Sequence, residues 1–371
     1  GHQGTAMALA PLAHVLFTRV LTYDAERPDW PDRDRFVLSA GHASILQYTL
    51  LHLAGFGVSL DDLRAFRQWG SATPGHPEVG HTPGVEVTTG PLGQGVANMV
   101  GMAIAESQLR SRYGADIVDH HVFGICGDGD LSEGISHEAA SLAGHLGLGR
   151  IVLCYDDNRI TIDGETELAL SDDAPARFRS YGWHVEELGE VGDDLAAIEA
   201  GLRRAQAVTD RPSLVVLRTH IATPAPDSID TSAAHGYALF DEEIAATKER
   251  MGLPADETFH IPDGVLDFYR KAGVRGRGER DAWESRVAAF TGDRTELEAQ
   301  LSGTGLPGWE SVLPSWEPGE KIATRKASNA AIGALAPVVP GLTGGGADLT
   351  GNTGTVLALS LIHISEPTRH D

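Results

Sequence analysis

The chain is poor in the residues that would link it covalently or draw it to an anionic partner. Its 371 residues include two cysteines, Cys126 and Cys154, which lie in apolar runs and are too few for a disulfide framework. With 29 Lys and Arg against 52 Asp and Glu, the formal net charge is -23, which argues against nucleic acid and anionic membranes as partners. No apolar run reaches the roughly 20 residues that span a membrane. We therefore expect a cytoplasmic protein with buried, reduced thiols.

What is present is the pattern of an α/β protein. The composition, 42% hydrophobic and 22% charged, is that of a globular chain long enough for two or three domains. Strand-like and helix-like segments alternate through the middle of the chain, which predicts a doubly wound parallel sheet with helices on both faces. Strands are predicted at 36–38, 121–126, 151–155, 183–188 and 213–217, and helices at 5–22, 44–54, 61–69, about 93–112, 133–146 and 193–208.

Polar residues follow two of these strands. Asp128 comes directly after the strand at 121–126, within Gly-Asp-Gly, and Asn158 follows the strand at 151–155. In open parallel sheets, ligands bind beyond the carboxyl ends of the strands. A hard divalent cation prefers oxygen ligands, and Mg²⁺ usually shares them with phosphates and water. The segment therefore predicts a metal-plus-diphosphate site, against the alternative of two ordinary turns.

Other phosphate-binding motifs do not fit the same segment. The glycines run Gly124-x-x-Gly127-x-Gly129, which is not the G-x-G-x-x-G of a dinucleotide site, and no Gly-Lys-Ser/Thr of a Walker loop follows. Instead, Gly127 and Gly129 permit a tight turn, and the amide donors at the start of the next helix favour an anion. Asp130 and Glu133 predict a capping box there.

Two helices carry further patterns. The helix at 133–146 has an apolar stripe, which we expect to face the core; it comprises Ile135, Ala139, Leu142 and Leu146. The helix that begins near residue 93 contains Gly93, Gly95 and Gly101, although glycine destabilises a helix interior by about 1 kcal/mol. Close approach of a cofactor or of another helix at a dimer interface explains this, and so does tight packing within the domain.

Several long motifs, in order, resemble the transketolase family. The main one is GDGDLSEGISHEAASLAGHLGLGRIVLCYDDNRITIDGET at 127–166, which is similar to that family's thiamine-diphosphate motif. The others are GHQGTAM at the start, DRDRFVLSAGHAS, TPGHPEVG, TTGPLGQGVANMVGMAIAE, DDAPARFRSYGWHV, AHG, ATRKASNAAIG and GGGADLTGN. The likeness covers most of residues 1–355.

The resemblance implies roles for single residues. It implies that Asp128, Asn158 and the backbone carbonyl of Ile160 ligate Mg²⁺ or Ca²⁺ on thiamine diphosphate. The residues implied to contact or support the cofactor are Gly127, His42, His235, Gly90 and Leu92, with Glu133 near the subunit contact. His2, His42, His76 and His235 would line the substrate channel, with His2, His76 and His235 in catalysis. Arg325 matches an arginine that holds the sugar phosphate.

The implied activity is reversible transfer of a two-carbon ketol unit from xylulose 5-phosphate to ribose 5-phosphate or erythrose 4-phosphate. The resemblance implies sugar-phosphate substrates and a homodimer of the full-length protein. Dihydroxyacetone synthase, 1-deoxyxylulose-phosphate synthase and one half of a split enzyme remain as alternatives. We expect a diphosphate- and Mg-binding domain at 1–303, a linker at 304–320 and a truncated start of a pyrimidine-binding domain at 321–355. Residues 356–371 are expected to be foreign or frameshifted, the N-terminus to be truncated and the fragment to be inactive alone.

Overall fold

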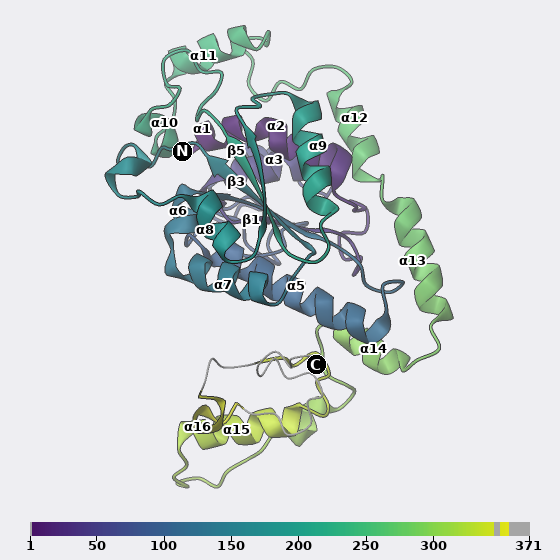
Figure 1. The fold of residues 1–371 in the computed structure, drawn as a ribbon. Coiled ribbons are helices and arrows are strands. Elements are labelled where there is room, and N and C mark those ends of the chain that lie inside the picture. The colour runs from purple at the N-terminus through teal and green to yellow at the C-terminus, as the bar shows by residue number, and fades with distance from the viewer. Residues whose placement is uncertain (1, 345–348, 356–371) are drawn as a thin grey trace. The chain divides into compact units, whose positions relative to one another are not determined.

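A five-stranded parallel sheet forms the centre of the first part of the chain (Figure 1). The computed structural model describes residues 2–344 and 349–355. In these residues the strand order is β1-β2-β3-β5-β4. The strands are β1 (Arg35–Leu38), β2 (Val122–Gly127), β3 (Ile151–Asp157), β4 (His184–Gly189) and β5 (Ser213–Arg218). The predicted α/β fold with a doubly wound parallel sheet is confirmed.

Helices cover both faces of this sheet, because alternate strand residues are apolar on both sides. Phe123, Ile125 and Cys154 belong to the core on one face, whereas Val122 and Cys126 belong to the core on the other. The first face packs against α2 (Ala10–Val15), α3 (Ser44–Ala54) and α9 (Leu195–Gln206). The second packs against α5 (Gln94–Tyr113), α7 (Gly134–His145) and α8 (Ala174–Ser180). The two free cysteines are therefore buried on opposite faces.

The N-terminal helical region is more broken than predicted. The expected single helix over 5–22 is α1 (Gln3–Ala8), α2 and a π-helical turn at Leu16–Val20. Pro11 lies at the start of α2, where its missing N–H is tolerated, so a new helix begins there. The expected helix at 61–69 is α4 (Leu60–Arg64), which begins with a capping box between Ser59 and Asp62.

The apolar stripe predicted for α7 faces the core only in part, through Ala139 and Leu146. Ile135 and Leu142 are 37% and 42% exposed. The buried residues of this helix are instead small: Ser136, Ala139, Ala140 and Ala143. A Cβ at Gly144 would lie 1.8 Å from the carbonyl oxygen of Tyr181, so the inward face of α7 has no room for large side chains. The stripe prediction was wrong for Ile135 and Leu142, because periodicity does not reveal how closely the neighbouring backbone approaches.

A further group of helices follows β5, the last strand in the part of the chain that the structure describes. They are α10 (Ser232–Gly236), α11 (Asp241–Arg250), α12 (Val265–Gly273), α13 (Arg277–Ala289), α14 (Arg294–Leu301), α15 (Thr324–Leu335) and α16 (Thr350–Thr353). α10 lies beside α1 (Figure 1). The chain divides into two compact units, Gly1–Arg286 and Val287–Asp371. The domain limits predicted at 303 and 320 stay predictions, and the tail predicted at 356–371 lies outside the described residues. Within the described residues, no helix is long and apolar enough to cross a membrane.

Candidate functional site

The ends of β2 and β3 place two predicted ligands at one edge of the sheet. Gly127 pairs with Asp156 in the last position of the parallel ladder between these strands. Asp128 is the first residue of α6 (Asp128–Ser132), and Asn158 is the first residue after β3. Both side chains therefore start from the carboxyl ends of neighbouring strands, where open α/β sheets bind ligands.

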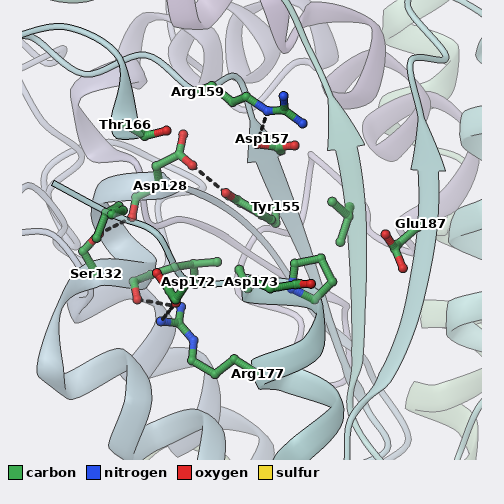
Figure 2. Close-up of a pocket in the computed structure, with 15 residues that line it drawn as sticks. Asp128, Ser132, Tyr155, Asp157, Arg159, Thr166, Asp172, Asp173, Arg177 and Glu187 are labelled. Carbon is green, nitrogen blue, oxygen red and sulfur yellow. Dashed lines mark hydrogen bonds and ion pairs between the residues drawn. The ribbon is translucent and has the colours of Figure 1, made fainter. Parts of the chain in front are cut away.

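The Asp128 carboxylate has one satisfied oxygen and one unsatisfied oxygen. The Tyr155 hydroxyl donates to Oδ1 at 2.5 Å (Figure 2), whereas Oδ2 is buried and has no hydrogen-bond partner. Burial raises the pKa of Asp128 to about 6, against the lowering effect of the Tyr155 hydrogen bond. A buried carboxylate oxygen without a partner is energetically costly, and a bound cation would remove that cost.

Asn158 and Ile160 supply two further oxygens from the loop after β3. The Nδ2 of Asn158 donates to Asp156 Oδ2 at 2.9 Å, and its Oδ1 accepts the Ile160 N–H at 2.9 Å. The Ile160 carbonyl oxygen is 3.0 Å from Nδ1 of His235. Carboxylate, amide and carbonyl oxygens are the ligand types that Mg²⁺ and Ca²⁺ prefer. No group of three or more His, Cys, Asp and Glu in the described residues is placed to hold a metal, so a cation here depends on the amide and carbonyl oxygens.

Histidines from distant parts of the chain gather beside this loop. The ring centroids of His2 and His42 are 5.0 Å apart, those of His42 and His235 are 5.2 Å apart, and those of His2 and His235 are 6.0 Å apart. His76 lies against Gly90, where a Cβ would be 3.2 Å from its ring. The structure thus brings the predicted histidines together and ties them to Ile160 through His235.

Burial shifts these histidines toward the neutral form by lowering their pKa. Burial is the main cause that lowers the pKa of His42 to about 3 and that of His2 to about 4. The neighbouring His235 adds to both shifts, and burial also lowers the pKa of His235 and His76. A neutral imidazole has one donor and one acceptor nitrogen. The cluster can therefore donate hydrogen bonds to hydroxyl groups and accept hydrogen bonds from them.

Two loops reach the site through close backbone contacts. A Cβ at Gly41 would lie 2.6 Å from Oγ1 of Thr89, which brings the loop before α3 against Gly90. Gly90 has φ 143°, a conformation that L side chains rarely adopt. Leu92 packs against Gly129, where a Cβ would lie 2.8 Å from Leu92 Cδ1. Gly90 and Leu92 therefore lie between His76 and the start of α6.

Asp130 has a structural role that the sequence did not reveal. Its buried carboxylate accepts hydrogen bonds from the Ser39 hydroxyl at 2.6 Å, the Gly93 N–H at 2.9 Å and the Gly127 N–H at 3.0 Å. The predicted capping box with Glu133 was wrong, because Asp130 binds these groups instead. Glu133 is exposed at the start of α7. The predicted contact of the Gly127 N–H with a diphosphate stays a prediction, and here that N–H donates to Asp130.

A cavity of about 320 Å³ is lined by Asp128 and Tyr155 (Figure 2). Arg177 crosses its wall, donating to the Leu131 carbonyl oxygen at 2.8 Å and to Asp172 at 2.5 Å. Of the predicted site residues, Asp128 alone lines it. Arg325 lies in the second compact unit, exposed near the start of α15, and its predicted phosphate contact stays a prediction.

A parallel α/β sheet with candidate oxygen ligands and histidines at its carboxyl edge is an arrangement typical of domains that bind a phosphorylated cofactor. Comparison with known proteins identifies the family of this domain. The family described as "Transketolase, thiamine diphosphate binding domain" matches residues 1–305, and the chain belongs to this family. The resemblance found in the sequence is confirmed.

Individual transketolases are similar to this chain over nearly its whole length. The transketolase of Mycobacterium tuberculosis is 48% identical over 368 residues, which are 96% of this chain and 52% of the relative. The solved transketolase from Leishmania mexicana matches with a TM-score of 0.89 and 43% identity, covering 96% of this chain and 54% of that one. The Pichia stipitis transketolase in complex with sedoheptulose-7-phosphate has a TM-score of 0.90 and 40% identity, with the same coverage. The chain thus spans about half the length of the curated relatives it matches.

Proposed function

We propose that this chain is the cofactor-binding half of a transketolase. The full-length protein would transfer a two-carbon ketol unit from xylulose 5-phosphate to ribose 5-phosphate or erythrose 4-phosphate, as a cytoplasmic homodimer. Support comes from the relatives, one of which was solved with the ketose phosphate sedoheptulose-7-phosphate. The two free, buried cysteines are compatible with a reducing compartment.

The observation that carries the proposal is the unpartnered Oδ2 of Asp128 beside the loop that holds Asn158 and Ile160. These residues would hold Mg²⁺ or Ca²⁺ against the diphosphate of thiamine diphosphate. The residues that would contact or support the cofactor are His42, His235, Gly127, Gly90 and Leu92, with Glu133 near the subunit contact. When bound, the cofactor supplies a nucleophilic carbon and an electron sink for the transferred unit.

The histidines would act on the sugar. His2, His76 and His235 would donate to and accept from its hydroxyl groups, and an imidazole kept neutral can take the hydroxyl proton as a carbon–carbon bond breaks. Arg325 would bind the sugar phosphate, which matches the fork of a guanidinium.

Calorimetric titration of the purified chain with thiamine diphosphate, in Mg²⁺ and in excess EDTA, tests the cofactor site. We expect Mg²⁺-dependent heat for the wild-type chain and for D193A, which removes an exposed carboxylate after β4. D128A should abolish the heat. Absence of heat for the wild-type chain, or uptake by D128A equal to wild type, would contradict the proposal.

A second measurement concerns turnover. Because the chain spans about half of its relatives, we expect ketol transfer from xylulose 5-phosphate to ribose 5-phosphate to stay at the level of a metal-free control. Transfer clearly above that control would show that this half suffices for the reaction.

A further inference from the structure

We propose that Asp156 is a positioning residue that turns the side-chain amide of Asn158 so that its oxygen, not its nitrogen, faces the cation. The inference rests on the cofactor site proposed above and deepens it. Asp156 would not touch the cation itself. Its role would be to fix the orientation of a ligand before the cation arrives.

Both oxygens of the Asp156 carboxylate already have partners within the protein. Oδ2 accepts a hydrogen bond from Nδ2 of Asn158 at 2.9 Å, and Oδ1 accepts one from the Thr219 hydroxyl. Thr219 follows β5, whose Leu217 pairs with Asp156 in the sheet. Asp156 is 1% exposed, so water does not compete for these oxygens. The carboxylate is therefore anchored to β5 on one side and holds Asn158 on the other.

Hydrogen bonding alone decides which end of the Asn158 amide faces the site, because the amide oxygen and nitrogen are nearly equal in size. A carboxylate only accepts, so Asp156 selects the amide nitrogen. The Ile160 N–H only donates, and at 2.9 Å it selects the amide oxygen. A flipped Asn158 would place its oxygen against the carboxylate and its NH₂ group against the Ile160 N–H.

The flipped state has no solvent to compensate it, since Asn158 is 3% exposed. An amide nitrogen cannot ligate Mg²⁺, so every flipped molecule lacks one of the three protein ligands proposed here. Removing Asp156 leaves only the Ile160 N–H to choose the orientation. Partners of this kind typically change metal affinity or activity by roughly 10–100-fold.

The experiment is a double-mutant cycle on the full chain. The readouts are the Mg²⁺ concentration that gives half-maximal calorimetric uptake of thiamine diphosphate and the melting temperature without metal. D156A should raise the half-saturating Mg²⁺ concentration by roughly 10–100-fold. In the N158D background both ends of the side chain are oxygens, so orientation no longer matters. D156A should then not weaken Mg²⁺ binding relative to N158D alone. Equal weakening in the two backgrounds would show a general structural or charge effect and overturn the inference.

D156N provides a second test that preserves the shape of the side chain. The oxygen of the introduced amide can accept from Asn158 while its nitrogen donates to the Thr219 hydroxyl, so we expect half-saturating Mg²⁺ within about threefold of wild type. A tenfold loss in a folded D156N chain would mean that the charge matters rather than the orientation. If the wild-type chain itself takes up no cofactor, the proposed function fails. If wild type binds and D156A binds equally well, only the role of Asp156 fails.

Discussion

The Tyr155 hydroxyl donates to one oxygen of Asp128 and leaves the other oxygen free. The donor–acceptor distance is 2.5 Å, and the second oxygen, Oδ2, is buried without a partner. Tyr155 lies on β3, paired in register with Cys126 on β2, two residues before Asp128. The sheet itself thus brings the hydroxyl to the carboxylate. One hydrogen bond holds the Asp128 side chain and leaves Oδ2 available to the proposed cation.

Replacing Tyr155 by Phe tests this relationship. Burial, together with the neighbouring Asp128, raises the pKa of Tyr155 well above its usual value, so the hydroxyl remains a donor at every working pH. Y155F should therefore raise the half-saturating Mg²⁺ concentration for thiamine diphosphate uptake by roughly tenfold. Y181F is the matched control, because the Tyr181 hydroxyl contacts His137 and none of the residues predicted to bind the cofactor. Unchanged Mg²⁺ dependence in Y155F would show that Asp128 needs no support from Tyr155.

Asp130 connects three segments around the site, and its loss should destabilise the domain. D130A leaves the Gly93 and Gly127 N–H groups without the acceptor they use here. We expect the free energy of unfolding to fall by roughly 2–4 kcal/mol. D173A removes an exposed helix cap of α8 and should lower it by only about 1 kcal/mol. Urea unfolding followed by tryptophan fluorescence measures both. Equal effects of the two substitutions would mean that the Asp130 hydrogen bonds add nothing beyond an ordinary cap.

Two glycines of α5 should respond in opposite directions to alanine. A Cβ at Gly95 would lie 2.5 Å from Cα of Ser39, whereas nothing lies within 4 Å of one at Gly101. G95A should therefore destabilise the chain by roughly 1–3 kcal/mol, because the Ser39 backbone must move. G101A should stabilise it by about 0.5–1 kcal/mol through helix propensity. Thermal unfolding of both variants measures these two changes in stability. A loss of stability in G101A would mean that this face packs against something in solution.

The sequence predicted the strands and their ends well. Apolar runs that stop at Gly-Asp-Gly and at Asp-Asp-Asn mark where β2 and β3 finish, so spacing alone placed Asp128 and Asn158 at one edge. The histidine cluster is different, because residues 2, 42, 76 and 235 have no periodic relationship. Only the resemblance to transketolases suggested that they meet.

The supporting residues escaped detection for a related reason. Tyr155, Asp156 and Asp130 act through partners on other strands or loops, and a single sequence does not show which side chains the sheet register brings together. A polar residue directly after an apolar run, as at Asp156, was the available signal. For Ile135 and Leu142 of the α7 stripe the error was the opposite one, since an apolar pattern was present but these two side chains are exposed and the buried residues of the helix are small.

The half-buried histidines His2 and His42 should make the chain sensitive to mild acid. In the folded state the pKa is about 3 for His42 and about 4 for His2, against about 6.5 in an unfolded chain. Below pH 6.5 the unfolded chain therefore binds protons that the folded chain does not, and the free energy of unfolding falls as the pH falls toward 4. H42Q removes one such group, so its melting temperature should drop by roughly 2–4 °C less than that of wild type between pH 7 and pH 5. H145Q changes an exposed histidine at the end of α7 and should follow wild type. If the melting temperatures of H42Q and wild type fall equally between pH 7 and pH 5, His42 is not held neutral in the folded chain.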